Sequence, residues 1–103
     1  MVAEVEYSDI IKIASMIRNT DAIATDRVVS ELLVHLKDKE ESLALKIVLD
    51  DEIVGIWFSK EFDKHVSLSF FYLDESVRKK PKGVEFFNHC YGLVNKSKPM
   101  YLV

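Results

Sequence analysis

Four basic side chains follow an apolar stretch in an arrangement that could hold phosphate. They lie within five positions of the chain and are Arg78, Lys79, Lys80 and Lys82, followed directly by Gly83. The run before them, 65–73, is rich in β-branched and aromatic residues, and apolar residues recur at helical spacing after Gly83. A helix amino terminus has backbone NH groups without internal partners and a partial positive charge, so anions bind there. The pattern predicts an anion site where a strand passes into a helix, with Gly83 allowing close approach of the backbone.

The same residues also permit a purely structural interpretation. The basic cluster could be a solvated loop whose charges keep a strand-helix junction in water, and Gly83 could be an ordinary turn glycine. A bulky residue at Gly83 separates the two interpretations. The anion interpretation predicts lost binding with the fold intact, whereas the turn interpretation predicts lost stability.

Metal and thiol chemistry find little support in the sequence. The three histidines, His35, His65 and His89, have no metal-ligand spacing and no companion cysteines, so we predict no metal site. Cys90 is adjacent to His89 on a predicted helix and therefore lies on a different face, which is not the geometry of a nucleophile and its base. We expect Cys90 to belong to the core.

Length and composition indicate one compact domain. The chain has 103 residues, about half of them hydrophobic, and we expect a single domain over 1–103. The formal charge of −3 argues against a general nucleic-acid-binding role. No apolar run approaches the ~20 residues that span a bilayer, and the amino terminus lacks the pattern of a secretory signal. These features predict a soluble, cytoplasmic protein with no membrane partner.

Hydrophobic periodicity predicts the order of the elements. A short strand is expected at 2–6, Ser8 is expected to cap a first helix, and Thr25 or Asp26 a second. Two β-rich runs flank Asp50 and Asp51, a pair suited to a tight hairpin. The remaining predicted elements are a strand over 65–73, a helix over about 82–95 and a last apolar segment over 100–103. This order predicts an α/β (α+β) fold of three layers with a mixed, mainly antiparallel sheet.

The second half of the chain resembles the GNAT superfamily of acyl-CoA-dependent N-acyltransferases. The family hairpin usually reads like 52–59 here, EIVGIWFS, with an acidic turn before it and a glycine in the second strand. The next strand then ends in the pattern Tyr-Val-x-x-x-x-Arg-x-x-Gly-x-Gly. Without any gap, this pattern falls on Tyr72 and Leu73, on Arg78, on Pro81 in place of the first glycine, and on Gly83. In element order the resemblance covers nearly the whole chain.

The resemblance implies a GNAT-like domain that transfers an acetyl group from acetyl-CoA to an amine of a small molecule or protein. The pyrophosphate of coenzyme A would lie over 79–84, and the pantetheine arm would pair with the backbone of 71–73 like an added strand. The implied cofactor-binding residues are Phe71, Tyr72, Leu73, Arg78, Lys79, Lys80, Lys82, Gly83 and Val84.

Acyl transfer also requires groups that move protons. A base must take a proton from the amine, and an acid can protonate the leaving thiolate. The nearest candidates in sequence are Asp74, Glu75 and His65 as base and Tyr72 as acid, and of these we select Asp74 and Tyr72. The alternative for Asp74 and Glu75 is a role as loop carboxylates or as partners of the adjacent lysines.

A second interpretation keeps the fold without the chemistry. Pro81 has no NH, and the loss of one charge-assisted donor to phosphate is worth roughly 1.5–3 kcal/mol. The chain would then be an inactive GNAT-fold binding or structural module, for example a phage virion-associated or host-modifying protein. On either interpretation the resemblance implies a short member without the usual C-terminal strands, whose exposed strand edge is covered in a homodimer or by a partner chain. A third interpretation makes the basic loop a contact for nucleic acid or an acidic protein, and the net negative charge opposes the former more.

Overall fold

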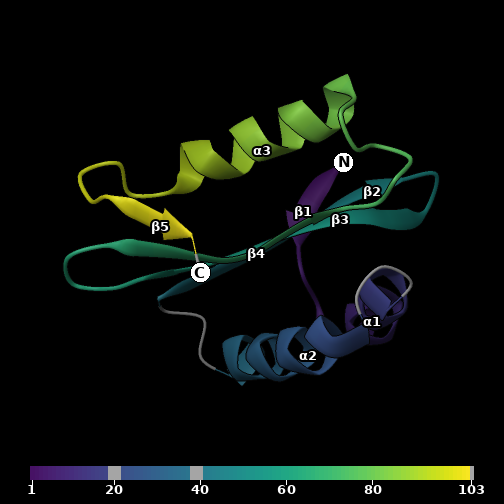
Figure 1. Ribbon diagram of the computed structural model, residues 1–103, viewed down its shortest axis with the longest axis horizontal. Coiled ribbons are helices and arrows are strands. Elements are labelled where there is room, and N and C mark those ends of the chain that lie inside the picture. The colour runs from purple at the N-terminus through teal and green to yellow at the C-terminus, as the bar shows by residue number, and fades with distance from the viewer. Residues whose placement is uncertain (19–21, 38–40, 103) are drawn as a thin grey trace.

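The chain folds into a five-stranded sheet with helices on both faces (Figure 1). The computed structural model describes residues 1–18, 22–37 and 41–102. The strands are β1 (Val2–Glu4), β2 (Ser42–Leu49), β3 (Glu52–Glu61), β4 (Val66–Leu73) and β5 (Met100–Leu102). The helices are the 3₁₀ turn η1 (Tyr7–Asp9), α1 (Ile10–Arg18), α2 (Ala22–Lys37) and α3 (Pro81–Leu93). The strands follow one another in chain order across the sheet, and all pairs are antiparallel except β4 with β5. The predicted three-layer α/β fold is confirmed.

The β2–β3 hairpin shows how closely a turn follows its sequence. Asp50 and Asp51 have φ angles of 51° and 64°. Two consecutive residues with positive φ form the type I′ turn, whose twist matches that of the flanking strands. Aspartate tolerates this conformation better than most residues, so the predicted hairpin forms at the predicted place.

The starts of the first two helices differ from the prediction. Ser8 does not cap α1, because it lies inside η1, where Glu6 is the N-cap and forms a capping box with Asp9. The second helix begins at Ala22, ahead of the predicted cap at Thr25. Thr25 is instead buried within α2, because it lies on the helix face that packs on the sheet.

Each face of the sheet has its own core. Among the described residues, the hydrophobic cluster under α1 and α2 consists of Val5, Ile13, Met16, Ile17, Val28, Leu32, Ala44, Ile56 and Phe58. The cluster under α3 consists of Leu45, Ile47, Val54, Trp57, Leu68, Val77, Phe86 and Cys90. Burial raises the pKa of the Cys90 thiol to about 12, so the thiol stays protonated and inert at neutral pH.

A bulge in β4 decides which side chains face which layer. Phe58 pairs with Phe70, but the next residue of β3, Ser59, pairs with Leu68, so Ser69 is an extra residue in β4. As a result Leu68 and Phe71 pack on the α3 side, whereas Phe70 packs on the α1–α2 side. The bulge shifts the alternation of the strand by one residue just before its carboxyl end.

Two classes of feature do not occur in the described part of the chain. None of its helices is long and apolar enough to cross a membrane. No three of its histidine, cysteine or acidic side chains are grouped closely enough to hold a metal ion.

Candidate functional site

The predicted cofactor-binding residues, together with Asp74, lie around the end of β4 and the start of α3, whereas His65 lies just before β4. A compact turn joins the two elements. Asp74 Oδ2 accepts hydrogen bonds from Ser76 N and Oγ at 3.1 and 2.7 Å, and Asp74 O accepts from Val77 N and Arg78 N. Lys79 then adopts a positive φ of 60°, which directs the chain into Pro81, the first residue of α3. The turn therefore fixes where the helix amino terminus lies.

The same turn affects the chemistry of Asp74. The two hydrogen bonds from Ser76 hold the pKa of the Asp74 carboxyl below the ordinary value of an aspartate. A carboxylate with a lowered pKa is ionised at neutral pH but accepts a proton from an amine poorly. As placed here, Asp74 stabilises the turn by its hydrogen bonds.

The backbone amides at the start of α3 are only partly available to a ligand. Gly83 N and Val84 N both donate to Lys80 O, at 3.0 and 3.2 Å, and Pro81 has no NH. The amides of Lys79 and Lys82 have no partner among the described residues. The predicted cradle thus offers two amides, together with the exposed side chains of the three lysines at 79, 80 and 82.

Gly83 has a packing role that is visible in the structure. A Cβ built on Gly83 would lie 2.5 Å from the carbonyl oxygen of Val77 and 2.9 Å from Leu73 Cδ1. No side chain can occupy that space unless α3 moves away from the turn. Gly83 therefore lets the first turn of α3 pack directly on the backbone of the loop.

We expect Gly83→Ala to destabilise the protein by about 1–3 kcal/mol, as overpacking against a rigid backbone does. Gly92→Ala is the matched control, because it lies in the same helix and a Cβ there meets nothing within 4 Å. That change should stabilise the protein by up to about 1 kcal/mol through helix propensity. Urea denaturation of both variants measures the difference. Equal stabilities of the two variants would contradict the packing role.

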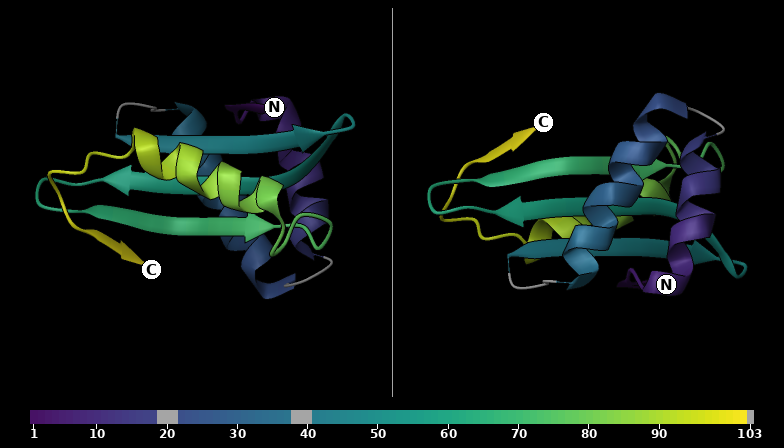
Figure 2. Two further views of the ribbon diagram at one scale, coloured as in Figure 1. Left: turned by 90° about the horizontal axis from the view of Figure 1, so that it is seen from above. Right: turned by 90° about the horizontal axis from the view of Figure 1, so that it is seen from below.

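The carboxyl end of β4 has an open edge. β5 pairs only with Val66, Ser67 and Leu68, and Figure 2 shows it beside the first part of β4 alone. Asp74 N donates to Val54 O of β3 at 2.7 Å. Because the direction of main-chain groups alternates along an antiparallel ladder, those of Phe71 and Leu73 point away from β3. This edge can accept an extended ligand as an added strand.

One main-chain group of the open edge, the carbonyl of Leu73, already accepts hydrogen bonds from Arg78. The Nη2 and Nε atoms of Arg78 donate to Leu73 O at 2.9 and 3.3 Å, and the guanidinium lies 5.8 Å from the ring centre of Tyr72. The structure therefore brings together three of the predicted residues, Leu73, Tyr72 and Arg78. The NH and carbonyl of Phe71 and the NH of Leu73 are left for a ligand.

Tyr72 faces the opposite layer from Phe71. Its side chain packs against the α1–α2 core, and its hydroxyl lies 3.4 Å from Met16 O of α1. Its flanking neighbours Phe71 and Leu73 pack on the α3 side. The predicted acid and the predicted strand-pairing residues therefore border the open edge from two sides.

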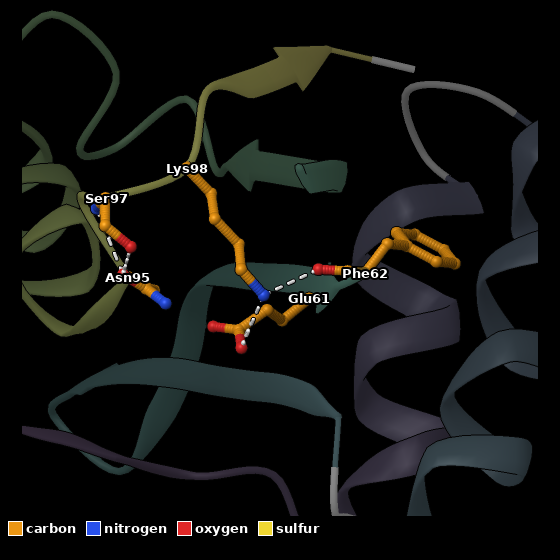
Figure 3. Close-up of polar contacts among 5 residues, drawn as sticks. All are labelled: Glu61, Phe62, Asn95, Ser97 and Lys98. Atoms are coloured by element: carbon orange, nitrogen blue, oxygen red, sulfur yellow. Dashed lines mark hydrogen bonds and ion pairs between the residues drawn. The ribbon is translucent and has the colours of Figure 1, made fainter. Parts of the chain in front are cut away.

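β5 is anchored at the other end of β4. Figure 3 shows Lys98 reaching across from the segment after α3 to the end of β3. Its Nζ is 3.2 Å from Glu61 Oε2 and 2.8 Å from Phe62 O. Ser97 N and Oγ both donate to Asn95 Oδ1 in the preceding turn. These contacts hold the entry to β5 beside the start of β4, and the described residues of β5 pair no further along β4 than Leu68.

A cavity of about 390 Å³ lies beside this anchor, between the β3–β4 hairpin, the start of β2 and the end of α3. None of the residues proposed from the sequence lines it. Its described walls carry Glu41, Glu61 and Asp63, together with the basic residue Lys98. Its acidic walls do not fit a phosphate ligand, so we place the candidate site at the open edge.

Two residues near the open edge were not foreseen from the sequence. Arg27 of α2 lies with its guanidinium carbon 5.2 Å from the ring centre of Phe70, and its Nε is 3.8 Å from Glu31 Oε1. Their i, i+4 spacing on a helix was the only signal in the sequence, and such pairs are common on solvent-exposed faces.

Comparisons with solved structures identify the fold. An aminoglycoside 6′-N-acetyltransferase complexed with coenzyme A matches 99% of this chain with a TM-score of 0.75 at 18% identity. The PaiA N-acetyltransferase from Thermoplasma acidophilum, in complex with coenzyme A, matches 90% with a TM-score of 0.72 at 14% identity, over 70% of its own length. A ribosomal-protein-alanine N-acetyltransferase from Brucella melitensis biovar Abortus 2308 matches 99% with a TM-score of 0.70 at 15% identity, over 77% of its length.

Similarity at these identities establishes the fold and not the activity. The chain spans 60% of the length of the aminoglycoside enzyme. No model of a known protein family matches it, and no curated protein matches it in sequence. From its strand order, its layers and these similarities, the chain has the fold of the GNAT N-acetyltransferases.

Proposed function

We propose that this protein binds an acyl-CoA, most simply acetyl-CoA, and transfers the acyl group to an amine. The observation that carries the proposal is the open edge of β4, which begins where β5 ends its pairing and runs directly to the amino terminus of α3. The pantetheine arm would pair with Phe71 and Leu73 as an added strand. The pyrophosphate would lie on the amides of Lys79 and Lys82, among the basic side chains of the loop.

Catalysis in this arrangement depends mainly on holding the thioester and the amine close together. Strand pairing would hold the thioester at the edge of β4, so that an amine arriving from the α1–α2 side meets it at close range. Tyr72 borders that side and is the group we assign to protonation of the leaving thiolate. Because the lowered pKa of Asp74 makes it a weak base, we expect the transfer to be slow unless the amine arrives unprotonated.

A binding module without chemistry is the second candidate. It is favoured by the amides of Gly83 and Val84, which are engaged within α3, and by Arg78, which is engaged with Leu73 O. Such a module would retain the edge of β4 and use it for a peptide strand or a partner chain.

Calorimetry with acetyl-CoA and with pantetheine tests the proposal. We expect acetyl-CoA to bind in the micromolar range, and pantetheine, which lacks the pyrophosphate, to bind about tenfold or more weakly, as the loss of charge-assisted phosphate contacts predicts. Release of free thiol in the presence of an amine panel then reports transfer.

A matched pair of lysine variants locates the ligand. Lys82→Gln removes a charge at the start of α3, and Lys64→Gln removes one at the β3–β4 hairpin, at the other end of β4. Only Lys82→Gln should weaken acetyl-CoA binding. No heat with acetyl-CoA would reject the proposal. Binding of acetyl-CoA without release of thiol would reject acyl transfer and favour the second candidate, a binding module.

A further inference from the structure

Two guanidinium groups lie over neighbouring aromatic rings of β4, and both rings pack on the α1–α2 side. Arg27 of α2 lies over the ring of Phe70, at 5.2 Å from its centre, and Arg78 lies over the ring of Tyr72, at 5.8 Å. The two rings are two residues apart on one strand and face the same layer, so they are separated by about 6.6 Å along the strand. Two segments far apart in the sequence thus place positive charge on one short stretch of β4.

Each guanidinium retains donors for a ligand. Arg78 uses Nε and Nη2 on Leu73 O, and a guanidinium carries five NH groups. Arg27 Nε is 3.8 Å from Glu31 Oε1, which is too long for a hydrogen bond. The side chain of Arg27 is 53% exposed. An anionic group that reaches this face can therefore be bound by both residues.

A carboxylate with an unpaired oxygen lies beside Arg27. Glu31 Oε2 is buried and has no hydrogen-bond partner in the described structure, although the side chain as a whole is 28% exposed. A buried acceptor without a donor costs about 1–3 kcal/mol and calls for an explanation. Because this oxygen is closed to solvent, the Glu31 side chain must turn outward before the NH group of a bound ammonium or amine can supply the missing donor.

We propose that the acceptor is an amine that carries an anionic group, a carboxylate or a phosphate, close to its nitrogen. Glu31 receives the amine, and Arg27 and Arg78 bind the anionic group. The two arginines supply the positive charge that an anionic group on the acceptor requires, although the whole chain carries −3. The inference rests on the proposed function, because the face matters for transfer only if the acyl group is bound at the adjacent edge.

NMR titration of the uniformly ¹⁵N-labelled chain without acetyl-CoA tests the inference by binding alone. The probes form matched pairs, β-alanine against propylamine for the carboxylate and O-phosphoethanolamine against ethanolamine for the phosphate. We expect the anionic member of at least one pair to bind about tenfold or more tightly, as one charge-assisted contact predicts, and to shift the amides of 70–72. The pair that shows the difference identifies the anion.

Charge variants on α2 provide the control. Arg27→Gln and Glu31→Gln should each weaken binding of the preferred probe by about tenfold. Lys37→Gln removes an exposed charge on the same helix, about 15 Å along its axis from Arg27, and should leave binding unchanged. Equal affinity within both pairs, or equal effects of Arg27→Gln and Lys37→Gln, would overturn the inference.

The acetyl-CoA calorimetry separates this inference from the proposed function. If acetyl-CoA binds but the anionic and neutral probes bind equally well, the anionic acceptor is rejected and the proposed transferase function is retained. Probe selectivity without acetyl-CoA binding rejects the transferase and retains the amine site.

Discussion

Asp9→Ala should lower the free energy of unfolding by about 3–5 kcal/mol, the usual cost of leaving one partner of a buried ion pair alone. Asp9 Oδ2 lies 2.6 Å from Lys46 Nζ, and the two side chains are only 10% and 11% exposed. The same oxygen accepts a hydrogen bond from Glu6 N at 2.8 Å. Alanine at position 9 would therefore leave an unpaired ammonium group and an unpaired amide between η1 and β2.

Two further variants assign the loss to its causes. Asp9→Asn keeps an acceptor for Glu6 N but removes the charge, so it should cost less than alanine. The double variant Asp9→Ala/Lys46→Met removes both charges and should recover much of the loss, because an apolar pair in place of a buried ion pair is often neutral. Denaturant titrations of the single and double variants complete the cycle. Additive losses, or a loss below about 1 kcal/mol for Asp9→Ala, would show that the ion pair contributes little.

The position of this pair connects it to the candidate site. Asp9 immediately precedes α1. Lys46 lies on β2, where it pairs with Ala3 of β1 on one side and with Ile56 of β3 on the other. The ion pair therefore fixes the start of the helix whose Met16 carbonyl contacts the Tyr72 hydroxyl. Loss of the pair should loosen α1 over the site before it affects the loop at 74–80.

The order of the elements could be predicted because local chemistry dictates it. Asp50 and Asp51 are suited to the positive φ angles of a type I′ turn, and the periodicity changes where the helices give way to strands. The start of α3 was predicted within one residue, at Lys82 for an observed Pro81, because apolar residues recur at helical spacing after Gly83.

The features that shape the site depend on contacts between distant segments, which the sequence did not reveal. The sequence 65–73 predicts a strand whose side chains alternate between the two faces without interruption. The bulge at Ser69 could not be predicted, since the extra residue is defined only by the pairing with β3. The approach of Arg27 to Phe70 depends on the angle at which α2 crosses the sheet. The engagement of Arg78 with Leu73 O depends on the turn at Asp74, and it changes the interpretation of a residue that the sequence assigned to phosphate.

Pro81→Ala should strengthen coenzyme A binding by about tenfold to a hundredfold. The change adds a backbone NH at the first position of α3, where no internal carbonyl can accept it, and a charge-assisted hydrogen bond to phosphate is worth about 1.5–3 kcal/mol. The new NH would join those of Lys79 and Lys82, which have no partner among the described residues. Stability should fall by about 0.4–1 kcal/mol, because proline restricts the unfolded chain.

The other proline of the chain supplies the control for this gain. Pro99 is exposed and precedes β5 at the far end of β4, so Pro99→Ala should leave coenzyme A affinity unchanged. Calorimetry on both variants measures the difference directly. Tighter binding by Pro81→Ala alone would mean that the diphosphate rests on the amides at the start of α3 and that proline weakens an otherwise complete site. If neither variant binds more tightly than the parent chain, the pyrophosphate does not lie at this helix end, and the open edge of β4 must serve a ligand without phosphate.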